Sequence, residues 1–278
     1  MKKQYIYLVA AVIIIAAAFL IFRNPESIKL PLPSPSPSPL PDQEQPEPKT
    51  PTQPTIPPTT SKQTKPAGTV ATQNQGRVVF AVTDASVPFT NVESVILMVN
   101  ELAVHSPTKG WITILKDLRA FDLLKLRKNP LLAFLADTKL DPGTYNQVRL
   151  LVEKVTVTSG GQTQEAKLPS GDLKLITKLV VTKGENSSVV FDFLLDKSLH
   201  TTTDGKYIFL PVIKLQTQSV LKSIQIRSGE LTIPTGTIDS DATIGMDENG
   251  NTKNGFSFNP ATEFELEGEK IKVKPQAN

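Results

Sequence analysis

From residue 77 onward, hydrophobic and polar positions alternate with a period of two, which predicts β-strands. The strand segments are rich in Val, Ile, Leu, Phe and Thr, and each is bounded by Gly, Pro, Asn or Asp. They cover 77–83, 93–106, 111–115, 145–159, 173–182, 187–195 and 207–217. Short strands at this regular spacing predict an all-β fold, an antiparallel β-sandwich of the immunoglobulin-like or prealbumin-like kind.

Two of these strands change face along their length. In 145–159 the apolar positions are even-numbered as far as Val152 and odd-numbered from Val155. A strand exchanges its faces only through an extra residue, so we predict a β-bulge near Glu153 and Lys154. The segment 93–106 shows the same switch.

One or two short helices are expected in the middle of the chain. Asp122 is placed to cap a short helix through 123–126, and Asn129 followed by Pro130 predicts a helix over 130–137.

The sequence divides into four parts: 1–23, 24–76, 77–217 and 218–278. The last part reads as a small β module of tight hairpins, one of them at Glu267-Gly268. No Pro/Gly linker separates it from the sandwich, which favours packing of the module on the sandwich.

The N-terminal part predicts a transmembrane signal-anchor. Residues 5–22 are uncharged and apolar, and at 1.5 Å per residue they span about 27 Å, close to the thickness of a bilayer core. Two lysines precede them, so the positive-inside tendency places the N-terminus in the cytoplasm and the rest of the chain outside the cell membrane. A cleaved signal peptide with small residues at 16–18 is the alternative.

Residues 24–76 predict a disordered, proline-rich linker. Between Pro25 and Pro66 there are 14 prolines, of 23 in the whole chain, and few large apolar residues. Because proline has no N–H to donate, this segment is expected to stay extended and solvated.

Composition excludes several functions. The formal net charge is only +3, and no segment has the concentrated positive charge that nucleic-acid binding requires. The chain has no cysteine, which removes disulfides and most zinc sites. No cofactor is expected.

The two histidines give little support to catalysis. His105 ends a strand and is expected to be a hydrogen-bonded structural residue, whereas His200 is expected in an exposed loop. Ser198 and His200 with Asp192 or Asp196 would make a hydrolase triad, but no G-x-S-x-G elbow accompanies them. A non-enzyme is therefore predicted, with a hydrolase as the weakest alternative.

Oxygen-bearing side chains alternate in the C-terminal module, a pattern that suits calcium. They are Asp239, Asp241, Asp247, Asn249 and Asn251. The EF-hand register fails, however, and Asn249-Gly250 is also a strong hairpin signal. A hairpin and a calcium site remain as alternatives.

Trp111, the only tryptophan, follows a predicted turn. An exposed aromatic ring there would stack on a sugar ring, so Trp111 is a candidate ligand-binding residue. Packing within a hairpin is the other interpretation.

Several motifs occur in the order found in the bacterial domain-of-unknown-function family 4382, which residues 77–217 resemble. The motifs are VTDA (82–85), VHS (104–106) with the following Trp111, FDLLKL (121–126), PGTYNQVRLLV (142–152), LPSG (168–171), FDF (191–193) with DKSL (196–199), and YIFLPVIKL (207–215). The resemblance implies an exported or surface-attached protein. It assigns no catalytic or binding residue, and Leu194 stands where the family often has a second acidic residue.

Together these features predict a single-pass membrane protein that displays a non-catalytic β-sandwich outside the cell for adhesion, envelope contact or ligand capture, with a glycan or protein as partner. A calcium-stabilised structural ectodomain is the alternative.

Overall fold

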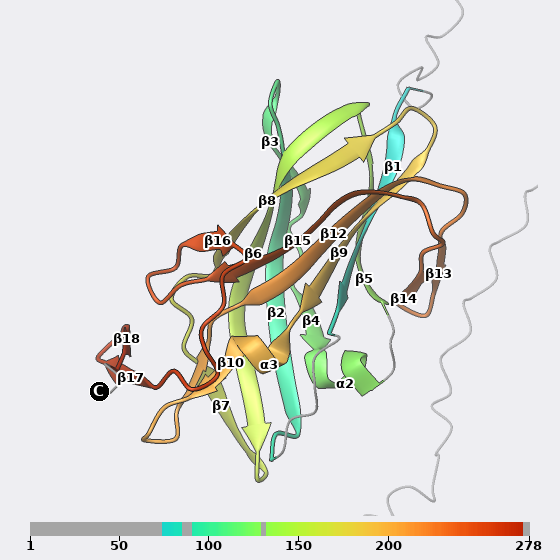
Figure 1. Ribbon diagram of the computed structural model, residues 1–278. Coiled ribbons are helices and arrows are strands. Elements are labelled where there is room, and N and C mark those ends of the chain that lie inside the picture. Colours follow the sequence, from blue (N-terminus) through green and yellow to red (C-terminus); the bar gives the residue numbers. More distant parts are fainter. Residues whose placement is uncertain (1–73, 85–90, 129–131, 275–278) are drawn as a thin grey trace, which may run out of the picture. The chain divides into compact units, whose positions relative to one another are not determined.

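Most of the described chain is β-structure. The computed structural model describes residues 74–84, 91–128 and 132–274 (Figure 1). The predicted membrane anchor at 5–22, and the linker as far as residue 73, lie outside the described residues. Within the described ranges, no helix is both long and apolar enough to cross a membrane.

The larger sheet has eight strands. In spatial order they are β13 (Gln225–Arg227), β14 (Glu230–Thr232), β5 (Leu132–Leu140), β1 (Gly76–Thr83), β9 (Asn186–Phe193), β12 (Val212–Leu221), β15 (Thr237–Met246) and β16 (Thr252–Asn254). Neighbouring strands are antiparallel except β1 and β9, which run parallel.

The smaller sheet has six strands, with β2 and β6 at its centre. They are β3 (Gly110–Leu115), β2 (Ser94–Ser106), β6 (Gly143–Ser159), β7 (Gln162–Ala166), β4 (Arg119–Asp122) beside β2, and β8 (Asp172–Val181) beside β6. Two further hairpins pair β10 (Leu199–Thr201) with β11 (Tyr207–Phe209) and β17 (Phe264–Glu267) with β18 (Lys270–Val273). The short helices are α2 (Leu123–Lys128) and α3 (Leu195–Ser198).

The two sheets bury one shared core, which confirms the predicted sandwich-like, mostly β architecture. Phe80 on β1 and Phe191 on β9 belong to the same buried cluster as Leu97 on β2 and Leu150 on β6. Each comes from the inward face of an alternating strand, as the period of two requires.

The two predicted bulges are confirmed. Between β2 and β6, Met98 pairs with Lys154 but Val99 pairs with Val152, so Glu153 is the extra residue in β6. Asn100 is the corresponding extra residue in β2. The bulges keep apolar side chains on the inner face on both sides of the face switch.

One helix prediction is confirmed and the other is wrong. The Asp122 carboxylate accepts the backbone N–H of Lys125 at 3.4 Å, at the start of α2. In contrast, 132–140 forms strand β5 and pairs with β1 from Leu140 to Ala133. The backbone N–H and C=O groups along the edge of β1 need hydrogen-bond partners. Pairing with β1 therefore outweighs the helical spacing of these residues.

The C-terminal residues contribute to the same sheet as the sandwich. Strand β12 runs across the expected boundary between 217 and 218, and β13 to β16 extend the eight-stranded sheet. The predicted hairpins at Asn249-Gly250 and Glu267-Gly268 both form. Gly250 has φ of 86°, a left-handed conformation in which glycine carries no steric penalty.

Candidate functional site

A row of four side chains crosses the outer face of the six-stranded sheet. His105 on β2 pairs with Trp111 on β3 and with Gln147 on β6, and Gln147 pairs with Ile176 on β8. Directly paired residues in antiparallel strands point to the same face. We call these four residues the Trp111 row; at about 4.8 Å per strand they span roughly 14 Å.

The ends of the Trp111 row are exposed and its middle is polar. Trp111 is 40% exposed and Ile176 is 63% exposed, although both side chains are large and apolar. The Trp111 and His105 rings meet edge to face, with centroids 5.1 Å apart. As predicted for a structural histidine, His105 Nδ1 lies 2.8 Å from Asn146 Oδ1, which fixes the orientation of the imidazole. Trp111 therefore packs within its hairpin and still presents ring surface to solvent.

The next row of side chains on this face contains a small residue, Ala103, followed by a group of charged residues. Ala103 pairs with Thr113 and with Arg149, so a methyl group lies between them. Arg149 Nε donates to Asp172 at 2.8 Å, and Lys174 Nζ lies 3.3 Å from the other oxygen of Asp172. The guanidinium is thus held beside the Trp111 row by an ion pair.

A pocket of about 230 Å³ lies near the Trp111 end of this sheet, between the turns that follow β2 and β5. Lys109 and Gln75 both donate to the Asp141 carboxylate, and these bonds, led by the one from Lys109, lower the pKa of Asp141. The Tyr145 hydroxyl donates to the Asp141 carbonyl at 2.9 Å. Burial, reinforced by the Asp141 charge, raises the pKa of Tyr145.

The five candidate calcium ligands do not form one cluster. Asp239 accepts from Ser219 at 3.1 Å, and Asp241 accepts from Gln216 and lies 3.4 Å from Lys214 Nζ. Both precede Asp247 by six or more residues of β15, or roughly 20 Å along an extended strand. Within the described ranges, no three His, Asp or Glu side chains are grouped to hold a metal ion.

Asp247, Asn249 and Asn251 are brought together, but by bonds among themselves. Asp247 Oδ1 accepts the backbone N–H groups of Asn249 at 3.0 Å and Asn251 at 2.9 Å, and Oδ2 accepts Lys253 Nζ at 2.7 Å. Burial is the largest single influence and opposes ionisation of Asp247, but the bonds from Lys253, Asn251 and Asn249 together lower its pKa. The carboxylate organises the turn between β15 and β16.

Ser198 and His200 are not joined as a catalytic pair. The Ser198 hydroxyl is fully buried, donates to the Leu194 carbonyl at 2.7 Å and accepts the Val212 N–H at 2.9 Å. His200 instead packs against Phe258 and Phe264, with ring centroids 6.3 Å and 4.7 Å away. The expectation of an exposed loop histidine is wrong, because these phenylalanines, distant in sequence, cover the ring.

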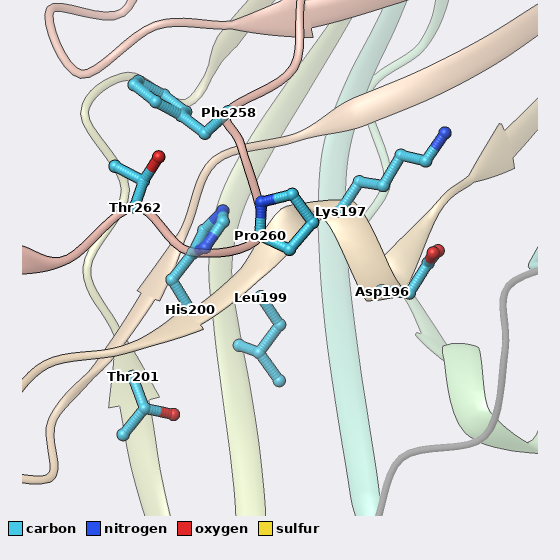
Figure 2. A pocket seen from close by; sticks show the side chains of 8 residues that line it. All are labelled: Asp196, Lys197, Leu199, His200, Thr201, Phe258, Pro260 and Thr262. Carbon is cyan, nitrogen blue, oxygen red and sulfur yellow. The ribbon is translucent and has the colours of Figure 1, made fainter.

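A pocket of about 280 Å³ lies beside His200 (Figure 2). Asp196, Lys197, Leu199, His200 and Thr201 line it from α3 and β10, and Phe258, Pro260 and Thr262 line it from the segment that follows β16.

A scan against family models matches residues 75–211 to the domain of unknown function DUF4382. The match supports the resemblance that the sequence motifs indicated for residues 77–217. The DUF4382 segment carries the whole Trp111 row and His200, and it ends just before β12. No curated protein and no solved structure gives a significant match.

Proposed function

We propose that this DUF4382 protein is a membrane-anchored, extracytoplasmic binding module that captures an extended oligosaccharide on the Trp111 row. The apolar segment 5–22 would anchor the chain with its N-terminus in the cytoplasm, and the proline-rich segment 24–76 would act as a solvated stalk. The protein would act by binding, without catalysis.

The Trp111 row is the observation that carries this proposal. An aromatic ring stacks on the apolar face of a sugar, while His105 and Gln147 supply polar atoms for its hydroxyl groups. The row extends about 14 Å across the sheet, a length that suits several linked sugar rings better than one small molecule. Ile176 gives a second apolar contact at the far end.

A glycan panel tests the ligand class directly. A ligand that binds only the folded state raises the melting temperature of the full chain in detergent micelles. We expect at least one oligosaccharide to do so, and Trp111→Ala to weaken its binding about fivefold or more, since aromatic stacking contributes about 1–3 kcal/mol in a comparable setting. Ile226→Ala is the matched control, because Ile226 is 38% exposed but lies on the other sheet.

If every oligosaccharide leaves the melting temperature unchanged, or if Ile226→Ala weakens binding as much as Trp111→Ala, the Trp111 row is not the site. Location is tested separately with protease added to intact cells. Cleavage in the stalk should release the β-domain, whereas a domain that is digested only after lysis would contradict the proposed orientation.

A further inference from the structure

The C-terminal arm, residues 257–274, is attached to the rest of the fold mainly by side chains. Its strands β17 and β18 pair with each other, and neither pairs with any other strand in the described chain. An isolated two-stranded hairpin is marginally stable in water, so this arm depends on what it packs against.

The arm packs on a small apolar cluster of its own. Phe264 and Ile271 of the arm are buried with Ile208 and Leu210, next to partly buried Leu266. This cluster is separate from the core between the two sheets. The arm can therefore be released without opening the sandwich core, which is the condition for local unfolding.

His200 lies where the arm meets the sandwich. Its ring contacts Phe264 and Phe258 of the arm, and it also forms a hydrogen bond with the Lys197 backbone. In Figure 2 the ring lies next to Pro260 at the edge of the pocket. The Nε2 atom is buried and has no hydrogen-bond partner among the described residues. A neutral imidazole tolerates this position, because Nε2 then carries only a lone pair.

Protonation of Nε2 would create a buried N–H donor and a positive charge with no hydrogen-bond acceptor among the described residues. Burial lowers the pKa of His200, and the bond to the Lys197 backbone offsets this only in part. Release of the arm would return the ring to water, where imidazole titrates near 6.5. The released state therefore binds a proton more readily than the docked state, and docking weakens as the pH falls below about 6.5.

The charged groups around His200 do not reverse this direction. Asp196 and Lys197 line the pocket from α3, and in the arm Lys274 lies 3.8 Å from Glu263. The remaining pairs are Asp204 with Lys206 in the turn after β10, and Glu269 of the arm with Lys167. Bonds from Thr202 and then Lys206 lower the pKa of Asp204, and the bond from Lys167 lowers that of Glu269. Carboxylates ordinarily titrate below pH 5, so the imidazole is the group expected to change charge between pH 5 and 7.

We propose that His200 is a pH-sensitive clasp: neutral, it holds the C-terminal arm on the sandwich, and protonated, it releases the arm. Release uncovers Ile208 and Leu210 and gives this end of the domain an apolar surface at acidic pH. The inference rests on contacts at α3, β10 and the arm, and it stands whether or not the Trp111 row binds a glycan.

Hydrogen exchange of the full chain in detergent micelles tests the clasp. After correction for the intrinsic pH dependence of exchange, we expect protection of residues 264–273 to fall between pH 7.5 and 5.5. The fall should not exceed about tenfold per pH unit, the limiting slope for a single proton. Strands β2 and β6 should keep their protection. His200→Phe retains an aromatic ring without a titrating group, so it should abolish the response, whereas His105→Phe should preserve it.

Unchanged protection of the arm in the wild-type protein would overturn the proposal, and so would a pH response that persists in His200→Phe. If that variant does not fold, NMR titration of the wild-type protein decides. The chain has only two histidines, so the His105→Phe spectrum assigns their resonances. His200 is expected to titrate below 6.5, and titration at or above that value would refute the clasp.

Discussion

Replacement of Asp247 tests whether this carboxylate stabilises the turn through its protein partners. In Asp247→Ala, the N–H groups of Asn249 and Asn251 lose their acceptor and Lys253 loses its ion pair. The Asp247 residue is 4% exposed, so water replaces these bonds poorly. A hydrogen bond to a charged group contributes about 1.5–3 kcal/mol, and partial rehydration of the two amides leaves an expected loss of about 3 kcal/mol.

The loss of stability should be visible as a change in melting temperature. In a domain of this size 1 kcal/mol shifts the midpoint by roughly 2–4 °C, so Asp247→Ala should lower it by roughly 6–12 °C. Asp241→Ala is the matched control: its pair with Lys214 is partly exposed and contributes about 1 kcal/mol or less. Asp247→Asn keeps an oxygen acceptor for the two amides and should fall between the two.

The same experiment separates the hairpin from the calcium alternative. If Lys253 and the two turn amides satisfy the carboxylate, the melting temperature of the wild-type protein should be equal in calcium and in a chelator. A rise in calcium that disappears in Asp247→Ala would refute this reasoning and would assign Asp247 as a ligand. Equal midpoints for Asp247→Ala and Asp241→Ala would also refute it.

Two further changes test the local geometry. Val220 has φ of 56°, which a β-branched residue adopts only under strain, so Val220→Asn should raise stability by about 1 kcal/mol in a melting experiment. Ile238→Asn, at a similarly exposed position with ordinary backbone, should give no gain. Deletion of Asn100 should leave a folded protein, because it removes the bulge and preserves the inward face of β2. Insertion of one alanine after Leu102 should instead turn Val104 outward and abolish cooperative unfolding.

Local pattern was sufficient to predict which residues of a strand face the core. The alternation and its two switches predicted one bulge near Glu153 and Lys154 and another within 93–106, and the glycine of Asn249-Gly250 predicted a hairpin. The family resemblance also held over 75–211. These features depend on residues only a few positions apart in the sequence, so the spacing of residue types predicts them directly.

Features that depend on distant partners were not predictable in this way. Residues 132–140 have apolar residues at helical spacing, but they form strand β5 because they hydrogen-bond to the edge of β1. Trp111 was identified as an isolated aromatic residue, but Gln147 and Ile176 had no signal, since only cross-strand register places them beside it. His200 was misplaced for the same reason: the residues that cover it follow some sixty positions later.

Strand β3, which carries Trp111, and strand β10, which carries His200, lie toward opposite ends of the β-domain (Figure 1). This separation allows two independent roles. The described chain enters next to Asp141, which Gln75 and Lys109 both contact, near the Trp111 end. Strand β1 then runs from Gly76 to Thr83, about 23 Å, toward α3 (Figure 1). The arm, which packs near β10 and β11, therefore lies toward the end of the β-domain opposite Gly76. Release of the arm would change the surface at that end, while the Trp111 row, held by the shared core, would keep its geometry.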